Sequence, residues 1–166
     1  MGRLVRFGAA RVLAYVAVAG LATVGCGGGG THGRAACSVV SRGEVGSALG
    51  EPVSGGKQVA PDPGSPPGLS GCSYSTANGG STFVVVWFLD GGGDDVYQRQ
   101  ATAVAQQHTA MVLDRGEGFT TATSHTAVAY TLVDHRYANV LVTNQTSAPS
   151  VKGAAEVARQ FVSASG

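Results

Sequence analysis

The chain has 166 residues and a formal net charge of +1, with 43% hydrophobic and 13% charged residues. This length suits one domain, and the apolar content is sufficient for a packed core, which argues against general disorder. The basic residues are scattered and form no stripe along the chain. The composition therefore indicates no nucleic-acid partner.

The first 25 residues are typical of an export signal. Arg3, Arg6 and Arg11 precede an uncharged, mainly apolar run over residues 12–25, which is the order of a basic region and a hydrophobic region in such signals. The run has about 14 residues, fewer than the ~20 that a membrane-spanning helix needs. We therefore expect residues 1–25 to be a signal peptide that is removed on export.

A single cysteine ends this run. The sequence TVGC at residues 23–26 resembles the lipobox of bacterial lipoproteins, in which a small residue precedes the cysteine, although leucine is more usual at the position of Thr23. The resemblance implies a diacylglycerol on Cys26 and a mature protein anchored by acyl chains at the extracytoplasmic face of the cell membrane. The alternative is ordinary cleavage after the AVA motif at residues 17–19, which would leave Cys26 unmodified.

Residues 26–36 are rich in glycine, and we expect them to form a flexible tether before a single domain over residues 37–166. With Cys26 lipidated, Cys37 and Cys72 remain as an even pair in an oxidising compartment, which predicts a disulfide. The bond would close a loop of about 36 residues and stabilise the fold by about 3–4 kcal/mol on the chain-entropy model. A metal or redox pair is the alternative, but the sequence lacks a C-x-x-C motif.

The first predicted element of the domain is a short helix. Ser41 and Glu44 form a capping-box pattern, and Gly50 marks the end of the helix. Residues 61–71, PDPGSPPGLSG, then predict a loop. This loop is either a spacer or a partner-contact segment, and Asp62 is its one ionisable side chain.

A β-hairpin is predicted next, over residues 72–90, with its turn at residues 78–80. The second strand is apolar throughout residues 83–89, so we expect both of its faces to be covered. Trp87, the only tryptophan, is therefore predicted to lie in the core.

A second helix, a second hairpin and a last helix follow. Residues 94–108 predict a helix capped by Asp94 or Asp95, and residues 125–144 predict a hairpin that turns at residues 134–136, with residues 119–124 as a further strand. The predicted apolar stripe of the second helix consists of Tyr97, Ala101, Val104, Ala105 and His108. One face of the second hairpin carries Val128, Tyr130 and Leu132, and one face of the last helix carries Val151, Ala154, Val157, Ala158 and Phe161.

The order of helix, hairpin, helix, hairpin, helix predicts the fold class. Hairpin turns, and not βαβ crossovers, connect the predicted strands, so the sheet should be antiparallel. Helices that alternate with such strand pairs pack on the sheet. We therefore expect an α+β fold with helices packed on an antiparallel sheet and one disulfide.

The block ACSVVSRGEVGSALGEPV…GCSYST and the closing AAEVARQFV resemble a family of small actinobacterial secreted proteins and lipoproteins with a domain of unknown function. The chain departs from the family pattern at residues 39–41, where LLT is usual, and at residues 116–130. The resemblance implies an α+β fold like the α-β-α sandwich of PsbP-type proteins, and it implies no catalytic residue. The matching positions are Cys37, Glu44, Val45, Leu49, Gly50, Cys72 and Tyr74.

The residues that could carry catalysis or bind a metal do not form a recognisable motif. No G-x-S-x-G sequence occurs, and the side chains of Asp134 and His135 should diverge from their predicted turn. His125 and His135 could flank one end of the second hairpin, but no third ligand is visible. The run DGGGDD at residues 90–95 fits helix capping better than a calcium loop. We predict no catalytic residue, no metal and no cofactor, and we expect His125 and His135 at the surface.

The predicted function is that of a non-catalytic envelope lipoprotein that binds a partner protein or an envelope component. The alternative is a carrier that holds a lipid or another apolar small molecule in a cavity between sheet and helices. A filled core with an exposed apolar patch would favour the binding protein. An apolar cavity of several hundred Å³ would favour the carrier.

Overall fold

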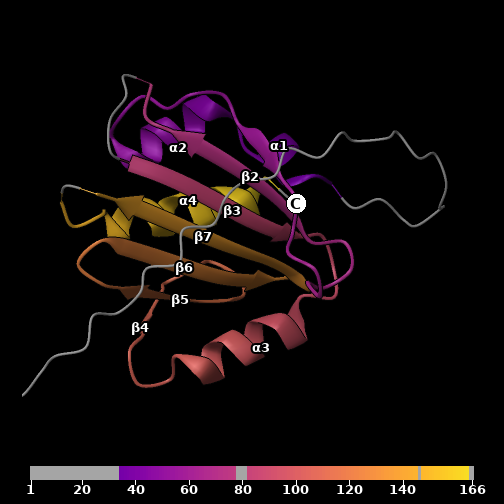
Figure 1. Cartoon of the computed structure of the whole chain (residues 1–166). Helices are drawn as coiled ribbons and strands as arrows, with labels where there is room; N and C mark the ends of the chain where they lie inside the picture. The colour runs from indigo at the N-terminus through magenta and orange to yellow at the C-terminus, as the bar shows by residue number, and fades with distance from the viewer. Residues whose placement is uncertain (1–33, 78–81, 146, 165–166) are drawn as a thin grey trace, which may run out of the picture. The chain divides into compact units, whose positions relative to one another are not determined.

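An antiparallel sheet of seven strands, with helices packed against it, forms the centre of the computed structural model (Figure 1). The structure describes residues 34–77, 82–145 and 147–164, all of which belong to one unit, Thr31–Gly166. The predicted signal peptide, Cys26 and the turn at residues 78–80 lie outside the described residues. The helices are α1 (Ala36–Val39), α2 (Arg42–Leu49), α3 (Asp94–Ala103) and α4 (Val151–Ser163), and the strands are β1 (Lys57–Val59), β2 (Ser70–Ser75), β3 (Thr82–Leu89), β4 (Thr109–Ala110), β5 (Glu117–Ala122), β6 (Thr126–Val133) and β7 (Arg136–Asn144).

The strand order is β1-β2-β3-β7-β6-β5-β4, and every neighbouring pair is antiparallel. The two predicted hairpins, β2–β3 and β6–β7, lie edge to edge through β3 and β7. The further strand expected before the second hairpin is β5, which pairs with β6. The predicted fold class is therefore confirmed, and the short edge strands β1 and β4 are additions that the sequence did not predict.

One face of the sheet, the closed face, is covered by α1, α2 and α4. Side chains from alternate positions of β3 and β7, including Val86 and Val140, meet Phe161 of α4 there, and all three are fully buried. Phe88 and Phe161 have ring centroids 6.1 Å apart. The predicted face of the last helix is confirmed, because its residues Ala154, Val157, Ala158 and Phe161 are all completely buried.

The predicted disulfide is present and fixes the start of the closed face to the sheet. Cys37 of α1 is bonded to Cys72 of β2. The Tyr74 hydroxyl on the same strand donates a hydrogen bond of 3.0 Å to the Val40 carbonyl, between α1 and α2. Two consecutive core-facing positions of β2 thus hold the same segment, one by a covalent bond and one by a buried hydrogen bond.

The capping signals that predicted α2 are confirmed. The Ser41 hydroxyl accepts a hydrogen bond from the Glu44 amide, and the Glu44 carboxylate accepts one of 2.7 Å from the Ser41 amide. These bonds lower the pKa of Glu44 below its usual range. Gly50 ends the helix in the left-handed conformation with φ 75°, which a residue without a Cβ adopts at little cost.

The second predicted helix is shorter than its pattern suggested. α3 ends at Ala103, because the chain must leave the helix for Thr109 to pair with Thr120 at the edge of the sheet. His108 therefore lies beyond the helix and is exposed, so the prediction that it closes a buried stripe was wrong. Its ring contacts Phe119 with centroids 5.3 Å apart.

The predicted cap of α3 was also wrong. The residue before the helix is Gly93, and no side chain makes a capping bond to it. Gly93 donates its amide to the His135 carbonyl at 2.8 Å, and a Cβ on it would lie 2.5 Å from the Cβ of Tyr137. The close approach of two backbones, which only glycine allows here, decides where α3 begins.

Candidate functional site

The second face of the sheet is only partly covered. α3 packs over one end of it, where Leu89, Leu132 and Tyr137 meet Tyr97 and Phe119 in a small buried cluster. A helix of ten residues is about 15 Å long and does not reach the other end of the strands. The prediction that both faces of the 83–89 strand are covered is confirmed for most of the strand, since Val85 and Leu89 on this face are buried. It was wrong at Phe83, which is 46% exposed, and Trp87 is only half-buried.

We call the uncovered part the open half-face. The strand register places two rows of side chains on it, each running across β2, β3, β7 and β6. One row is Ser73, Val85, Leu141 and Val128, and the other is Ser75, Phe83, Thr143 and Thr126. The first row is apolar from β3 to β6, with Val85 buried, and the second row has the exposed Phe83 between residues that carry hydroxyl groups.

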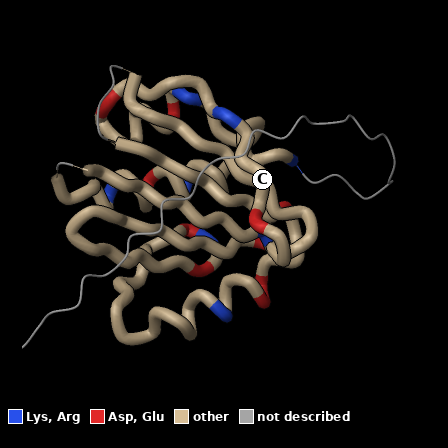
Figure 2. The backbone as a smooth tube through the Cα atoms, viewed as in Figure 1, with Lys and Arg blue, Asp and Glu red and all other residues tan. Residues whose placement is uncertain are grey.

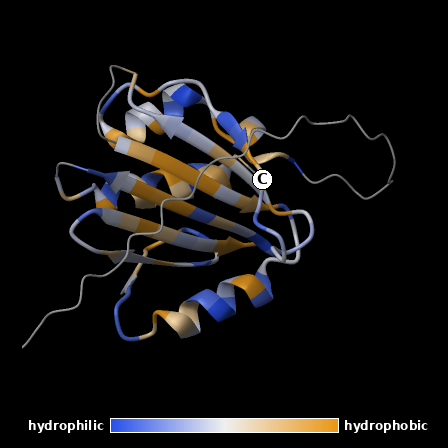
Figure 3. Cartoon of the chain, viewed as in Figure 1, coloured by the Kyte–Doolittle hydropathy of each residue, from blue (hydrophilic) through white to orange (hydrophobic). Residues whose placement is uncertain are grey.

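On β2, β3, β7 and β6 the open half-face carries no charged side chain, but Lys57 of β1, the cross-strand partner of Ser73, borders it on the same side of the sheet. β2, β3 and β6 contain no Lys, Arg, Asp or Glu, and Figure 2 shows these strands uncharged along their length. Glu117 of β5 and Arg136 of β7 stand at the other end of the sheet, near α3. Figure 3 shows β3 as a strongly hydrophobic band within this sheet. An uncharged apolar surface of this kind is typical of a binding site for another molecule.

A cleft of about 300 Å³ adjoins the open half-face, between the 61–69 loop and α3. We call it the Trp87 cleft. Trp87 and the buried Tyr137 lie at its sheet side. Polar side chains enter from three elements: Asp62 and Ser65 from the loop, Gln100 from α3 and Asn139 from β7. The loop that the sequence left as either spacer or contact segment thus forms one wall of a cleft.

Trp87 is held in this cleft by a glycine on the neighbouring strand. Gly71 is its cross-strand partner, and a Cβ at Gly71 would lie 2.6 Å from Cζ3 of the indole. The ring therefore lies against the backbone of β2, in space that any other residue would fill. Apolar character alone predicted Trp87 in the core, and the GCSY sequence at residues 71–74 was the signal of this Gly–Trp pair that was missed.

The tyrosines around the cleft remain neutral near pH 7. Burial raises the pKa of Tyr137 and of Tyr130, against the smaller opposite effect of a hydrogen bond with Asn139. Burial, assisted by the Glu117 carboxylate, raises the pKa of Tyr97 to about 12. Among the residues that line the cleft, Asp62 is the one with an acidic or basic side chain.

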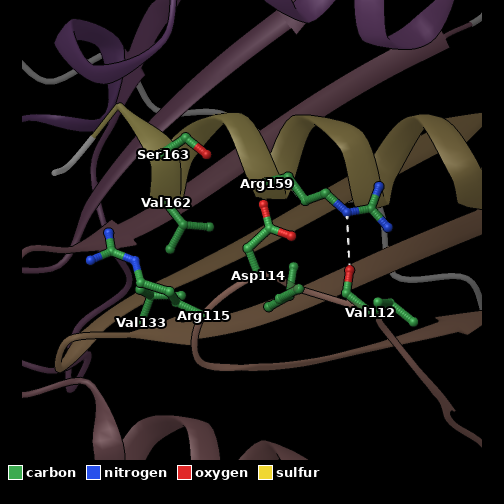
Figure 4. A pocket seen from close by; sticks show the side chains of 8 residues that line it. Val112, Asp114, Arg115, Val133, Arg159, Val162 and Ser163 are labelled. Carbon is green, nitrogen blue, oxygen red and sulfur yellow. Dashed lines mark hydrogen bonds between the residues drawn. The ribbon is translucent and has the colours of Figure 1, made fainter.

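A second cleft of about 300 Å³ lies beside the C-terminal end of α4 (Figure 4). Its two arginines have partners within the protein, and Asp114 also lines it. Arg115 lies 3.6 Å from the Asp134 carboxylate, and Arg159 binds Glu156 at 3.1 Å and donates Nε–H to the Val112 carbonyl at 3.4 Å. Figure 4 shows the two guanidinium groups on opposite sides of the cleft. They do not converge on one point, so the geometry does not form an anion site.

The histidines do not come together. His125 precedes β6 and His135 stands in the turn after it, so they lie at opposite ends of the hairpin, which rules out the suggested metal pair. Both are exposed, as expected. The side chains of the turn diverge, with Asp134 near Arg115 and His135 Nδ1 2.9 Å from Asp94. Within the described ranges, no three His, Cys, Asp or Glu side chains lie close enough together to hold a metal ion.

No protein-family model matches this chain, and neither a curated protein sequence nor a solved structure is significantly similar to it. None of the helices among the described residues has the length and apolar character needed to cross a membrane. Two large apolar side chains of the described part are exposed: Phe83 on the open half-face, at 46%, and Val112 beside the second cleft, at 86%.

Proposed function

We propose that this chain is a non-catalytic lipoprotein of the cell envelope that binds a partner protein or another envelope component through the open half-face. The lipobox-like sequence at residues 23–26 and the basic, then apolar, residues before it support the lipid anchor on Cys26. The observation that carries the binding role is the half of a sheet face that α3 leaves open, where Phe83 is 46% exposed, beside a well-packed opposite face. The resemblance to small actinobacterial lipoproteins agrees with the lipid anchor.

The packing of the closed face favours binding at the surface over transport in an internal cavity. Ala154 and Ala158 of α4 are completely buried, and so are Ala127 and Ala129 of β6. Small side chains on both elements let the helix approach the sheet closely, which fills the space where a carrier would hold its cargo. The clefts described above lie at the surface instead.

The anchor is tested by replacing Cys26. In the Cys26→Ala variant we expect loss of the thioether-linked lipid mass and release of the protein from membranes into the aqueous fraction. Ser38→Ala, an exposed change elsewhere in the chain, is the matched control and should leave the protein in the detergent phase. Membrane partitioning that is unchanged in Cys26→Ala would contradict the anchor.

The binding face is tested by site-specific photo-crosslinking in the native envelope. A photoreactive residue at Phe83 or Leu141 should give a discrete cross-linked species, because both positions lie on the open half-face. The same residue at Arg99, an exposed position of α3, is the control and should give none. Equal cross-linking from all three positions would contradict a specific face.

Native mass spectrometry distinguishes the carrier. The protein purified from its own envelope should carry the anchor lipid as its one retained lipid. A second apolar molecule retained after removal of the anchor would favour the carrier and contradict the proposal.

A further inference from the structure

We infer that the Trp87 cleft binds a neutral saccharide, with the indole as the platform for a sugar ring. The inference rests on the proposed binding function and specifies the chemical class of the ligand. It follows from three properties of the cleft, which are the support behind Trp87, the chemistry of its polar groups and its charge.

The support behind Trp87 makes the indole a rigid surface. Gly71 lets the ring lie against β2, and the neighbouring core positions of this strand are fixed by the disulfide of Cys72 and the hydrogen bond of Tyr74. The C–H bonds on one face of a pyranose are weakly positive and stack on the negative face of an aromatic ring. A ring that is already held in place loses little entropy when a sugar binds to it.

The polar groups of the cleft suit sugar hydroxyls. Asp62 of the loop and Gln100 of α3 end in planar carboxylate or amide groups, whereas the Asn139 amide of β7 is already hydrogen-bonded to Tyr137 and Tyr130. Such a group can bond two neighbouring hydroxyls at once, because its two polar atoms point the same way. Ser65 adds a hydroxyl. A volume of about 300 Å³ is at the lower end for small-molecule sites and suits about one or two sugar rings.

The charge of the cleft indicates a neutral ligand. No Lys or Arg is among its lining residues, and Asp62 contributes one negative charge. An anionic ligand would meet repulsion from Asp62 without a compensating cation.

A longer saccharide would also reach the open half-face. Along β3 the side chains of Trp87, Val85 and Phe83 point to the same side of the sheet, and Phe83 lies about 13 Å from Trp87 at ~3.3 Å per residue. Hydroxyls of Ser73 and Thr143 flank Val85 and Phe83 on the two neighbouring strands. We therefore expect trisaccharides to bind more tightly than the corresponding monosaccharides.

The sole tryptophan allows a direct test. We would titrate the full-length Cys26→Ala variant with cellotriose, maltotriose, chitotriose, mannotriose and arabinotriose and follow its fluorescence, which reports on Trp87 alone. We expect a saturable change with at least one of these neutral probes, and a weaker response to its monosaccharide. The anionic trigalacturonate should bind at least about tenfold more weakly, because the cleft has no cation.

A matched pair of variants assigns the binding to the cleft. Gln100→Ala should raise the Kd about tenfold, because its amide lines the cleft. Gln98→Ala, on the outer side of the same helix, should leave the Kd unchanged. Asp62→Ala should weaken binding as well, from the opposite wall.

The outcomes that overturn the inference are separate from failure of the proposed function. Three results would overturn the saccharide inference: no saturable fluorescence change with any neutral probe, tighter binding of trigalacturonate than of the neutral probes, or equal loss of saccharide affinity in Gln98→Ala and Gln100→Ala. Saturable binding of a decaproline peptide in the absence of saccharide binding would likewise replace the saccharide with a peptide ligand. If the anchor and the Phe83 cross-link hold in these cases, the proposed function stands without this ligand class.

Discussion

The two faces of the sheet are built from the same strands and yet differ in how they are used. On the closed face, three helices cover side chains such as Val84, Val86 and Phe88 of β3. On the other face, α3 covers one end only, and Phe83 remains almost half exposed. Because successive side chains of a strand point to opposite faces, one uninterrupted apolar strand supplies both a core and an open surface.

The difference shows that an apolar strand is not by itself a core strand. Burial requires a second layer, and the extent of that layer is set by the length and position of the covering helix. α4 has thirteen residues with an apolar face along its length, whereas α3 has ten, and Tyr97 is its one buried side chain. The uncovered surface is therefore a consequence of α3 being short and lying at one end.

The largest expected effect comes from a pair of phenylalanines, one on each face. Phe161→Ala on α4 should lower the free energy of unfolding by about 3–5 kcal/mol, because it removes a completely buried ring. Phe83→Ala on the open half-face should change it by less than about 0.5 kcal/mol. Chemical denaturation of both variants measures the comparison. Similar costs at the two positions would mean that the open half-face is covered in the folded protein.

A smaller effect is expected at Asp90, between β3 and α3. The Asp90 carboxylate accepts hydrogen bonds of 3.0 Å from the Arg34 amide, just before α1, and from Arg136 Nε, at the start of β7. Asp90 therefore links the segment that leads into the helices of the closed face to the sheet. The bond from the Arg34 backbone, together with the two arginine charges, lowers the pKa of Asp90, while its partial burial opposes the shift. Asp90→Asn should destabilise the fold by about 1–2 kcal/mol at pH 7.

The pH dependence of this effect follows from the direction of the shift. A lowered folded pKa means that the stabilisation is present above the unfolded value of about 4 and is lost as pH falls through the folded pKa. Unfolding curves of wild type and Asp90→Asn should therefore converge below about pH 4. The control is Asp95→Asn, at an exposed aspartate in α3, whose difference from wild type should be small throughout. Curves that stay parallel down to low pH would show that ionisation of Asp90 is not the cause.

The smallest expected effects on stability compare the N-terminal ends of α2, on the closed face, and α3, on the other face. Ser41→Ala should cost about 1 kcal/mol, because its hydroxyl caps α2 on the closed face. Asp94→Ala should cost less, since Asp94 makes no capping bond and its pKa is lowered chiefly by the hydrogen bond with the exposed His135. Thermal unfolding of the two variants decides the order. A larger loss in Asp94→Ala would indicate that α3 depends on a cap after all.

Local patterns in the sequence were sufficient for the parts of the fold that depend on near neighbours. The capping box of Ser41 and Glu44 and the apolar face of α4 follow from residues three or four positions apart. The pairing of Cys37 with Cys72 followed from their being the two cysteines left once Cys26 is assigned to lipid. In these cases the interacting residues are close together in the sequence, or, as for the cysteines, each residue has one possible partner.

Tertiary structure alone decided what the strands and loops would be used for. His108 continues a helical pattern, but the pairing of Thr109 with Thr120 ends α3 before it. Trp87 has the character of a core residue, but it lies where α3 does not reach and where Gly71 leaves room for its ring. Asp62, Gln100 and Asn139 are far apart in the chain and share a cleft only because the sheet brings loop, helix and strand together. Pairing across long sequence separations determines which surfaces are covered, and a local pattern carries no information about it.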